Sequence, residues 1–124
     1  MERVLGVGGI FFKAADPAKL KAWYRDNLGL PGDENGEIMF PTHGEPGSVL
    51  VWSPFPADTK YFEPSPASFM LNFRVKDLKA MLAQLRAAGA VVDEKVLDES
   101  YGKFGWVLDP EGNRIELWEA PAEG

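Results

Sequence analysis

Cysteine is absent from this sequence of 124 residues. The chain therefore has no disulfide framework, no thiolate nucleophile and no cysteine-based zinc or iron–sulfur site. Histidine is almost absent, because His43 is the single example. No apolar run reaches the ~18 residues that a membrane-spanning helix needs, and the first residues lack the basic and apolar regions of a secretory signal. We therefore expect a cytoplasmic protein without a membrane partner.

Positive charge is also in short supply. The 13 lysines and arginines are outnumbered by 19 aspartates and glutamates, which gives a formal net charge of -6. Nucleic acids and anionic membranes are both bound through a basic face, so neither is expected as a partner. Phosphate-binding glycine loops and the Gly-x-Ser-x-Gly elbow of serine hydrolases are missing as well. The remaining candidates for a partner are small molecules and other proteins.

An internal repeat organises the chain. Residues 9–16 (GIFFKAAD) align with residues 70–77 (MLNFRVKD) at a constant offset of 61 positions. Each copy reads as a strand and closes on an aspartate that can cap a helix, which is Asp16 followed by Pro17 in the first copy and Asp77 in the second. The repeat predicts two related units within one compact domain that spans residues 1–124.

A helix is predicted after each of the two aspartates, because apolar side chains recur there at helical spacing. Gly29 and Gly89 are the expected helix ends, since glycine readily adopts the left-handed conformation found after a helix. In the first helix Trp23 and Tyr24 lie at core spacing, so we interpret them as structural residues.

Short extended pieces follow each helix. Five of them are predicted as strands, over residues 37–40, 48–52, 91–96, 104–108 and 114–118. The turns are rich in residues that fix φ or accept a positive φ, and they are expected at residues 31–36, 44–47 and 109–113. Both halves of the chain therefore read as strand, helix and several strands.

Residues 54–66 separate the two halves and contain four prolines. We interpret this segment as a linker between a first module at about 4–53 and a second at about 67–120. A freely disordered linker would be poor in aromatic residues. The aromatic side chains of this one should pack on the body or cover a pocket rim, and they are Phe55, Tyr61 and Phe62.

Three stretches together resemble the glyoxalase/bleomycin-resistance/extradiol-dioxygenase superfamily, also called the vicinal oxygen chelate superfamily. They are GGIFFKAADP at 8–17, WYRDNLGL at 23–30 and, most specifically, DPEGNRIELW at 109–118. The resemblance implies an α+β fold in which two tandem βαβββ modules form curled mixed sheets around a cleft. It also implies a homodimer. Because the superfamily contains metal-dependent lyases, isomerases, epimerases and dioxygenases beside metal-free drug-binding proteins, it does not decide the function.

The resemblance also indicates where a metal would bind. It implies four ligand positions, which in this chain are Gly9, Met70, Val51 (or Trp52) and Glu116. Only Glu116 can ligate a divalent cation, and one carboxylate cannot replace the three or four ligands of a firmly held metal. We therefore expect no cofactor. The alternative is an atypical metal site in which His43 joins Glu116.

Strand alternation predicts which side chains face the concave side of the sheet, where the resemblance implies a pocket. Beside Glu116 we expect the ligand-binding residues Phe11, Lys13, Met70, Asn72, Arg74 and Trp106. If Lys13 and Arg74 line the pocket, they suit an apolar or aromatic ligand with a carboxylate or another oxyanion. They could instead only neutralise acidic neighbours.

Two interpretations of Glu116 stay open, and they predict opposite shifts of its pKa. The favoured one is an ion pair with Lys13, Arg74 or Arg114, which would lower the pKa. The other is a general base whose pKa is raised by burial in an apolar pocket. Tyr101 is the second candidate catalytic residue, as a hydrogen-bond donor or acid, although packing is the more usual role of such an aromatic side chain.

Three functions follow from these residues. The first is metal-free acid/base catalysis on a small molecule by Glu116 and Tyr101. The second is sequestration of an aromatic or drug-like compound, as in the bleomycin-resistance branch. The third is a glyoxalase-like lyase or a dioxygenase with an atypical metal site.

Overall fold

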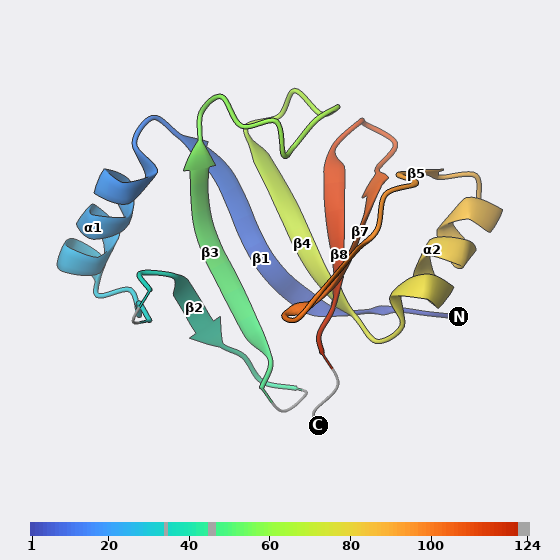
Figure 1. The fold of residues 1–124 in the computed structure, drawn as a ribbon, viewed down its shortest axis with the longest axis horizontal. Helices are drawn as coiled ribbons and strands as arrows, with labels where there is room; N and C mark the ends of the chain where they lie inside the picture. The colour runs from blue at the N-terminus through green and yellow to red at the C-terminus, as the bar shows by residue number, and fades with distance from the viewer. Residues whose placement is uncertain (34, 45–46, 122–124) are drawn as a thin grey trace.

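The computed structural model describes residues 1–33, 35–44 and 47–121. One eight-stranded sheet runs through the molecule in the order β2-β3-β1-β4-β8-β7-β5, and β6 pairs with β7 beside this path. Two helices flank the curved sheet at opposite ends (Figure 1). The elements are β1 (Val4–Ala14), α1 (Pro17–Leu28), β2 (Ile38–Pro41), β3 (Val49–Pro56), β4 (Phe69–Val75), α2 (Leu78–Ala87), β5 (Val91–Val92), β6 (Leu97–Glu99), β7 (Gly102–Leu108) and β8 (Arg114–Glu119).

The two repeat copies meet at the centre of the sheet. Strand β1 pairs antiparallel with β4, and each then pairs parallel with the last strand of its own copy, β1 with β3 and β4 with β8. The outer strands add antiparallel pairs, β2 on β3 and β7 on β8. The predicted α+β fold of curled mixed sheet is confirmed by this arrangement.

Both helices begin as the sequence predicts. The Asp16 side chain accepts a hydrogen bond from the Lys19 amide at 3.1 Å, and the Asp77 side chain accepts one from the Ala80 amide at 3.0 Å. Each bond satisfies one of the amides that a helix start leaves without an internal partner. At the far ends, Gly29 and Gly89 both have positive φ.

The two helices contribute differently to the core. Leu78, Met81 and Leu82 of α2 are buried against the side chains of Val75, Val107 and Leu117. Full burial of side chains of this size contributes about 1.5–3 kcal/mol each. Helix α1, in contrast, buries no residue fully, and Trp23 is 53% exposed. Of the two aromatic residues predicted as structural, only Tyr24 packs on the sheet, with its ring 4.4 Å from that of Trp52.

Two strand predictions are corrected. Strand β3 continues to Pro56 and so takes the first part of the predicted linker. Past Trp52 this strand no longer pairs with β2, and proline is tolerated in a strand that has a partner on one side only. The predicted strand 91–96 ends after Val92 because the Asp93 carboxylate accepts the Lys95 amide in a tight turn, and the short β6 follows.

The turn predicted at 109–113 is confirmed, since the Asp109 side chain accepts the amides of Glu111 and Asn113 and Gly112 has a φ of 84°. The turns predicted at 31–36 and 44–47 include residues 34 and 45–46, which lie outside the described residues. No helix in the described part of the chain is long and apolar enough to cross a membrane.

Candidate functional site

A straight row of residues crosses one face of the sheet. In order along the row these are Val51 on β3, Gly9 on β1, Asn72 on β4, Glu116 on β8 and Trp106 on β7, each paired with the next. Because alternate residues of a strand point to opposite faces, Leu117 beside Glu116 and Val107 beside Trp106 pack under α2 instead. The register of the sheet thus places an amide and a carboxyl side by side at its centre.

A cavity of about 740 Å³ lies over this row. Its aromatic walls are Phe11, Tyr101, Phe104 and Trp118. Its polar side chains are Asn35, Glu37, Asn72 and Glu116. No lysine or arginine is found among the described residues that line it. The volume falls within the range of about 300–1,000 Å³ that is usual for small-molecule sites.

Glu116 is 2% exposed and accepts hydrogen bonds from three neutral donors. Asn72 Nδ2 lies 2.7 Å from Oε1, Trp106 Nε1 lies 3.0 Å from Oε2, and the Tyr61 hydroxyl also donates to Oε2. The ion pairs found among the described residues do not include Glu116. Burial raises the pKa of Glu116, and the three donors and the charge of Arg114 oppose that rise.

The hydroxyl that reaches Glu116 comes from the segment between β3 and β4. The Tyr61 ring is stacked on Phe55, with centroids 5.5 Å apart, and stands edge-on to Trp106 at 6.1 Å. Phe62 beside it is 1% exposed. Burial and the neighbouring Glu116 raise the pKa of Tyr61, so the phenol keeps its proton and acts as a donor. The prediction that these aromatic residues pack on the body is confirmed.

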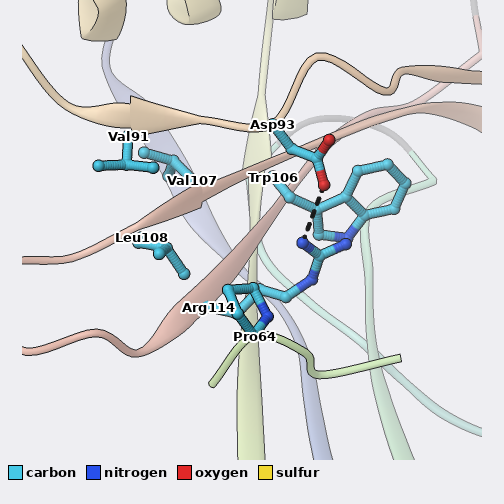
Figure 2. Close-up of a pocket in the computed structure, with 7 residues that line it drawn as sticks. All are labelled: Pro64, Val91, Asp93, Trp106, Val107, Leu108 and Arg114. Carbon is cyan, nitrogen blue, oxygen red and sulfur yellow. Dashed lines mark hydrogen bonds and ion pairs between the residues drawn. The ribbon is translucent and has the colours of Figure 1, made fainter. Parts of the chain in front are cut away.

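The Trp106 ring packs against Arg114, which forms an ion pair with Asp93 (Figure 2). The guanidinium carbon of Arg114 lies 4.8 Å from the centroid of the Trp106 ring, and its Nη1 lies 3.1 Å from Asp93 Oδ2. The backbone amide of Asp93 donates to the Trp106 carbonyl at 2.9 Å. A smaller cavity of about 180 Å³ adjoins this group. Asp93 and Arg114 therefore orient the indole whose N–H donates to Glu116.

Asn72 has one polar atom without a partner. Its Nδ2 donates to Glu116, but its buried Oδ1 accepts no hydrogen bond from the described residues. The oxygen lies against Gly8, where a Cβ atom would collide with it. A buried acceptor without a partner costs about 1–3 kcal/mol. The site therefore keeps a buried acceptor without a partner among the described residues, beside Gly8.

A comparison with protein families matches residues 9–118 to the glyoxalase-like domain. The chain belongs to the glyoxalase-like family. The superfamily predicted from the sequence motifs is thereby confirmed. No curated protein matches the chain at a significant level.

Solved structures with the same fold are related to this glyoxalase-like protein at low sequence identity. A Streptomyces coelicolor methylmalonyl-CoA epimerase variant in complex with 2-nitronate-propionyl-CoA is 17% identical, with a TM-score of 0.71 over 97% of this chain and 100% of that chain. A superfamily member from Vibrio splendidus 12B01 is 15% identical, with a TM-score of 0.57 over 96% and 99%. The Mn(II)-bound glyoxalase from Novosphingobium aromaticivorans is 21% identical, with a TM-score of 0.62 over 96% and 40%.

The predicted catalytic and ligand-binding residues other than the two cations lie in the cavity lining or in the buried cluster beside it. Phe11, Asn72, Tyr101 and Glu116 line the large cavity. Met70 and Trp106 instead belong to the buried aromatic cluster.

The two predicted cations also lie outside the cavity lining. Lys13 Nζ is 5.9 Å from the centroid of the Phe62 ring, and Arg74 Nη1 donates to the Val7 carbonyl at 2.7 Å. The oxyanion-binding role expected of Lys13 and Arg74 therefore gains no support from the geometry.

Sequence reasoning missed several lining residues. Glu37 and Met39 enter the cavity from β2 and the chain before it, and Phe104 of β7 joins Trp118, which strand alternation does place on the concave face. The position of β2 relative to β8 depends on the curvature of the sheet, and no local sequence signal encodes that curvature. Tyr61 was also missed as a partner of Glu116, although its place in an aromatic linker was a usable signal.

The residues at the expected metal positions do not fit a metal centre. Gly9 and Val51 lie in the row beside Glu116 but carry no ligating group. Met70, the expected ligand position on β4, pairs with Phe11, and Asn72 is the residue of β4 that pairs with Gly9. His43 is exposed and lies outside the cavity lining, and the described residues include no group of three His, Cys, Asp or Glu side chains. We derive no metal-dependent step from this donor set.

The raised pKa of Glu116 makes a testable statement about stability. The unfolded state loses the Glu116 proton near pH ~4.3, whereas the folded state holds it to higher pH. The contribution of Glu116 to the free energy of unfolding is therefore fully present below its pKa in the unfolded state. It is lost as the pH rises through its pKa in the folded state. As the pH rises above about 4.3, we expect Glu116→Gln to gain stability relative to wild type, by about 1.4 kcal/mol for each unit that separates the two pKa values.

Urea unfolding at a series of pH values measures this difference directly. Glu111→Gln, at an exposed turn, controls for the loss of one negative charge. A constant difference between Glu116→Gln and wild type over the whole range would contradict the raised pKa.

Proposed function

We propose that this glyoxalase-like protein binds a small, uncharged organic molecule with an aromatic or apolar body in the cavity over Glu116. The observation that carries the proposal is a buried carboxyl, surrounded by neutral donors, on the wall of a cavity of about 740 Å³. Buried polar groups of this kind orient a ligand, and apolar walls supply most of the affinity.

The polar groups of the cavity favour a ligand that donates hydrogen bonds. Glu116 and Glu37 both line the cavity and are hydrogen-bond acceptors when ionised. An oxyanion would meet two carboxyl groups and no cation among the described lining residues. A carboxamide, amine or hydroxyl group therefore suits the site better than the carboxylate that the sequence suggested.

The aromatic walls favour a planar body. The rings of Phe104 and Trp118 are nearly parallel, at 6° and 6.1 Å, and Tyr101 stands 5.6 Å from Phe104. Tyr101 is 62% exposed and lies at the open side of the cavity. A flat ring can enter past Tyr101 and stack on these faces.

Two isosteric probes, 2-naphthamide and 2-naphthoate, test the proposal. Each is titrated into the protein, and binding is followed by the backbone amide chemical shifts in NMR spectra. We expect 2-naphthamide to bind at least about tenfold more tightly, because the carboxylate is desolvated beside Glu116 without a counter-ion. Shifts should centre on the amides of Gly8, Asn72 and Glu116.

Truncation of one wall provides the matched variant. Phe104→Ala should weaken 2-naphthamide binding by about tenfold, since aromatic pairs and buried area each contribute about 1 kcal/mol or more. Leu28→Ala, at an exposed apolar position of α1 outside the cavity lining, should leave the affinity unchanged. Tighter binding of 2-naphthoate, or equal binding by Phe104→Ala and wild type, would contradict the proposal.

Metal-free proton transfer is the second candidate function, and the raised pKa of Glu116 favours it. A carboxylate with a raised pKa binds a proton more strongly and is a more effective general base than an ordinary glutamate. In this reaction Glu116 would take a proton from an acidic C–H of the bound molecule and return it to the same carbon. The fold is shared with an epimerase from Streptomyces coelicolor. Tyr101 is placed at the open side of the cavity, where its hydroxyl could donate to a ligand oxygen.

Deuterium exchange separates catalysis from binding alone. With 2-tetralone as the probe in D₂O, catalysis predicts faster deuterium incorporation at the benzylic carbon than in buffer. The acceleration should fall by at least about 100-fold in Glu116→Gln, because a positioned general base contributes about 10²–10⁴-fold. Binding of 2-tetralone without any acceleration would sink the catalytic candidate and leave the binding function in place.

A further inference from the structure

A second groove of about 630 Å³ lies on the outer side of the molecule along α2. Leu78 and Leu82 form part of it and belong to the core cluster under the helix. Glu116 and its cavity lie on the other face of the sheet, because Glu116 and Leu117 alternate along β8 and Leu117 packs in the same cluster as Leu82. The α2 groove is therefore separate from the site described above.

The rim of the α2 groove concentrates positive charge. Four of the 13 cationic residues of the chain line it, namely Lys76, Lys79, Arg86 and Lys103. They gather there although the chain as a whole carries a net charge of -6.

The two carboxylates in the same groove are already engaged. Asp77 accepts the Ala80 amide at 3.0 Å as the helix cap. Glu119 accepts the Leu78 amide at 2.9 Å and lies 3.7 Å from Lys103 Nζ. The ion pairs of the described residues include none made by Lys76, Lys79 or Arg86. Three cationic side chains of the rim are therefore left to meet a ligand.

The floor of the α2 groove is apolar. Leu78 and Leu82 are almost fully buried, whereas Val96 is 47% exposed. An apolar floor beneath a cationic rim matches a molecule with an apolar body and an anionic head. Burial of the body on Val96 and pairing of the head with the rim would both stabilise the complex.

The first repeat copy provides an internal comparison. The corresponding groove beside α1 has about 320 Å³ and includes Asp16, the counterpart of Asp77. Lys19 is its one cation among the described residues. The fold itself therefore does not require a cationic rim at this place, and only the groove of the second copy has one among the described residues.

We propose that the α2 groove binds an amphipathic organic oxyanion, with an alkyl or ring body on the apolar floor and a phosphate or carboxylate head on the rim of Lys76, Lys79 and Arg86. The α2 groove is separate from the cavity over Glu116, so this proposal and the proposed function can each fail without the other.

The site can be tested by NMR titration of the full chain with octyl phosphate, octanoate and 1-octanol, each kept below its critical micelle concentration or solubility limit. We expect one or both anions to shift the amide resonances of Leu78, Lys79 and Lys103. An anion that causes these shifts should bind at least tenfold more tightly than 1-octanol. Lys79→Glu and Arg86→Glu should each weaken anion binding by about tenfold. Both positions are exposed, so the fold should tolerate the change.

Lys19→Glu is the matched control, because it reverses an exposed charge at the first turn of the other helix. It should leave anion binding within about twofold of wild type. The proposal is overturned if neither anion shifts these amides at millimolar concentration, if 1-octanol binds as well as the anions, or if Lys19→Glu weakens binding as much as Lys79→Glu does.

Discussion

The carboxyl group of Glu116 is the point on which the site depends. Its three donors come from β4, β7 and the segment before β4, so one side chain ties together parts of the chain that are far apart in sequence. Transfer of a carboxyl group from water into the protein interior costs several kcal/mol when the group is ionised and much less when it is protonated. Neutral donors reduce that cost without removing it, and so the pKa of Glu116 remains raised.

This arrangement limits what the cavity can do. An ion pair would have fixed Glu116 as a permanent carboxylate, but Arg114 is directed to Asp93 and stacks on Trp106 instead. A metal would need ligands where Gly9 and Val51 stand. The cavity therefore offers the Glu116 carboxyl group, which can accept a hydrogen bond or a proton, among aromatic walls. These properties favour an uncharged ligand with a donor group.

Much of the fold could be predicted from the sequence because its signals are local. Asp16 and Asp77 cap helices through contacts three residues away, and strand alternation places Asn72 and Glu116 on one face. The partners of Glu116 could not be predicted in the same way. Tyr61 reaches it only because the linker folds back over the sheet, a path set by long-range packing. Homodimerisation and a cytoplasmic location stay predictions.

The most direct test of this account is the pKa of Glu116, measured by ¹³C NMR on side-chain-labelled glutamate and assigned with the spectrum of Glu116→Gln. The account predicts a titration midpoint above the ordinary value for glutamate, which is about 4.3. A midpoint at or below that value would mean that Glu116 is a stabilised carboxylate. It would then contradict both the neutral character of the site and a role for Glu116 as a general base.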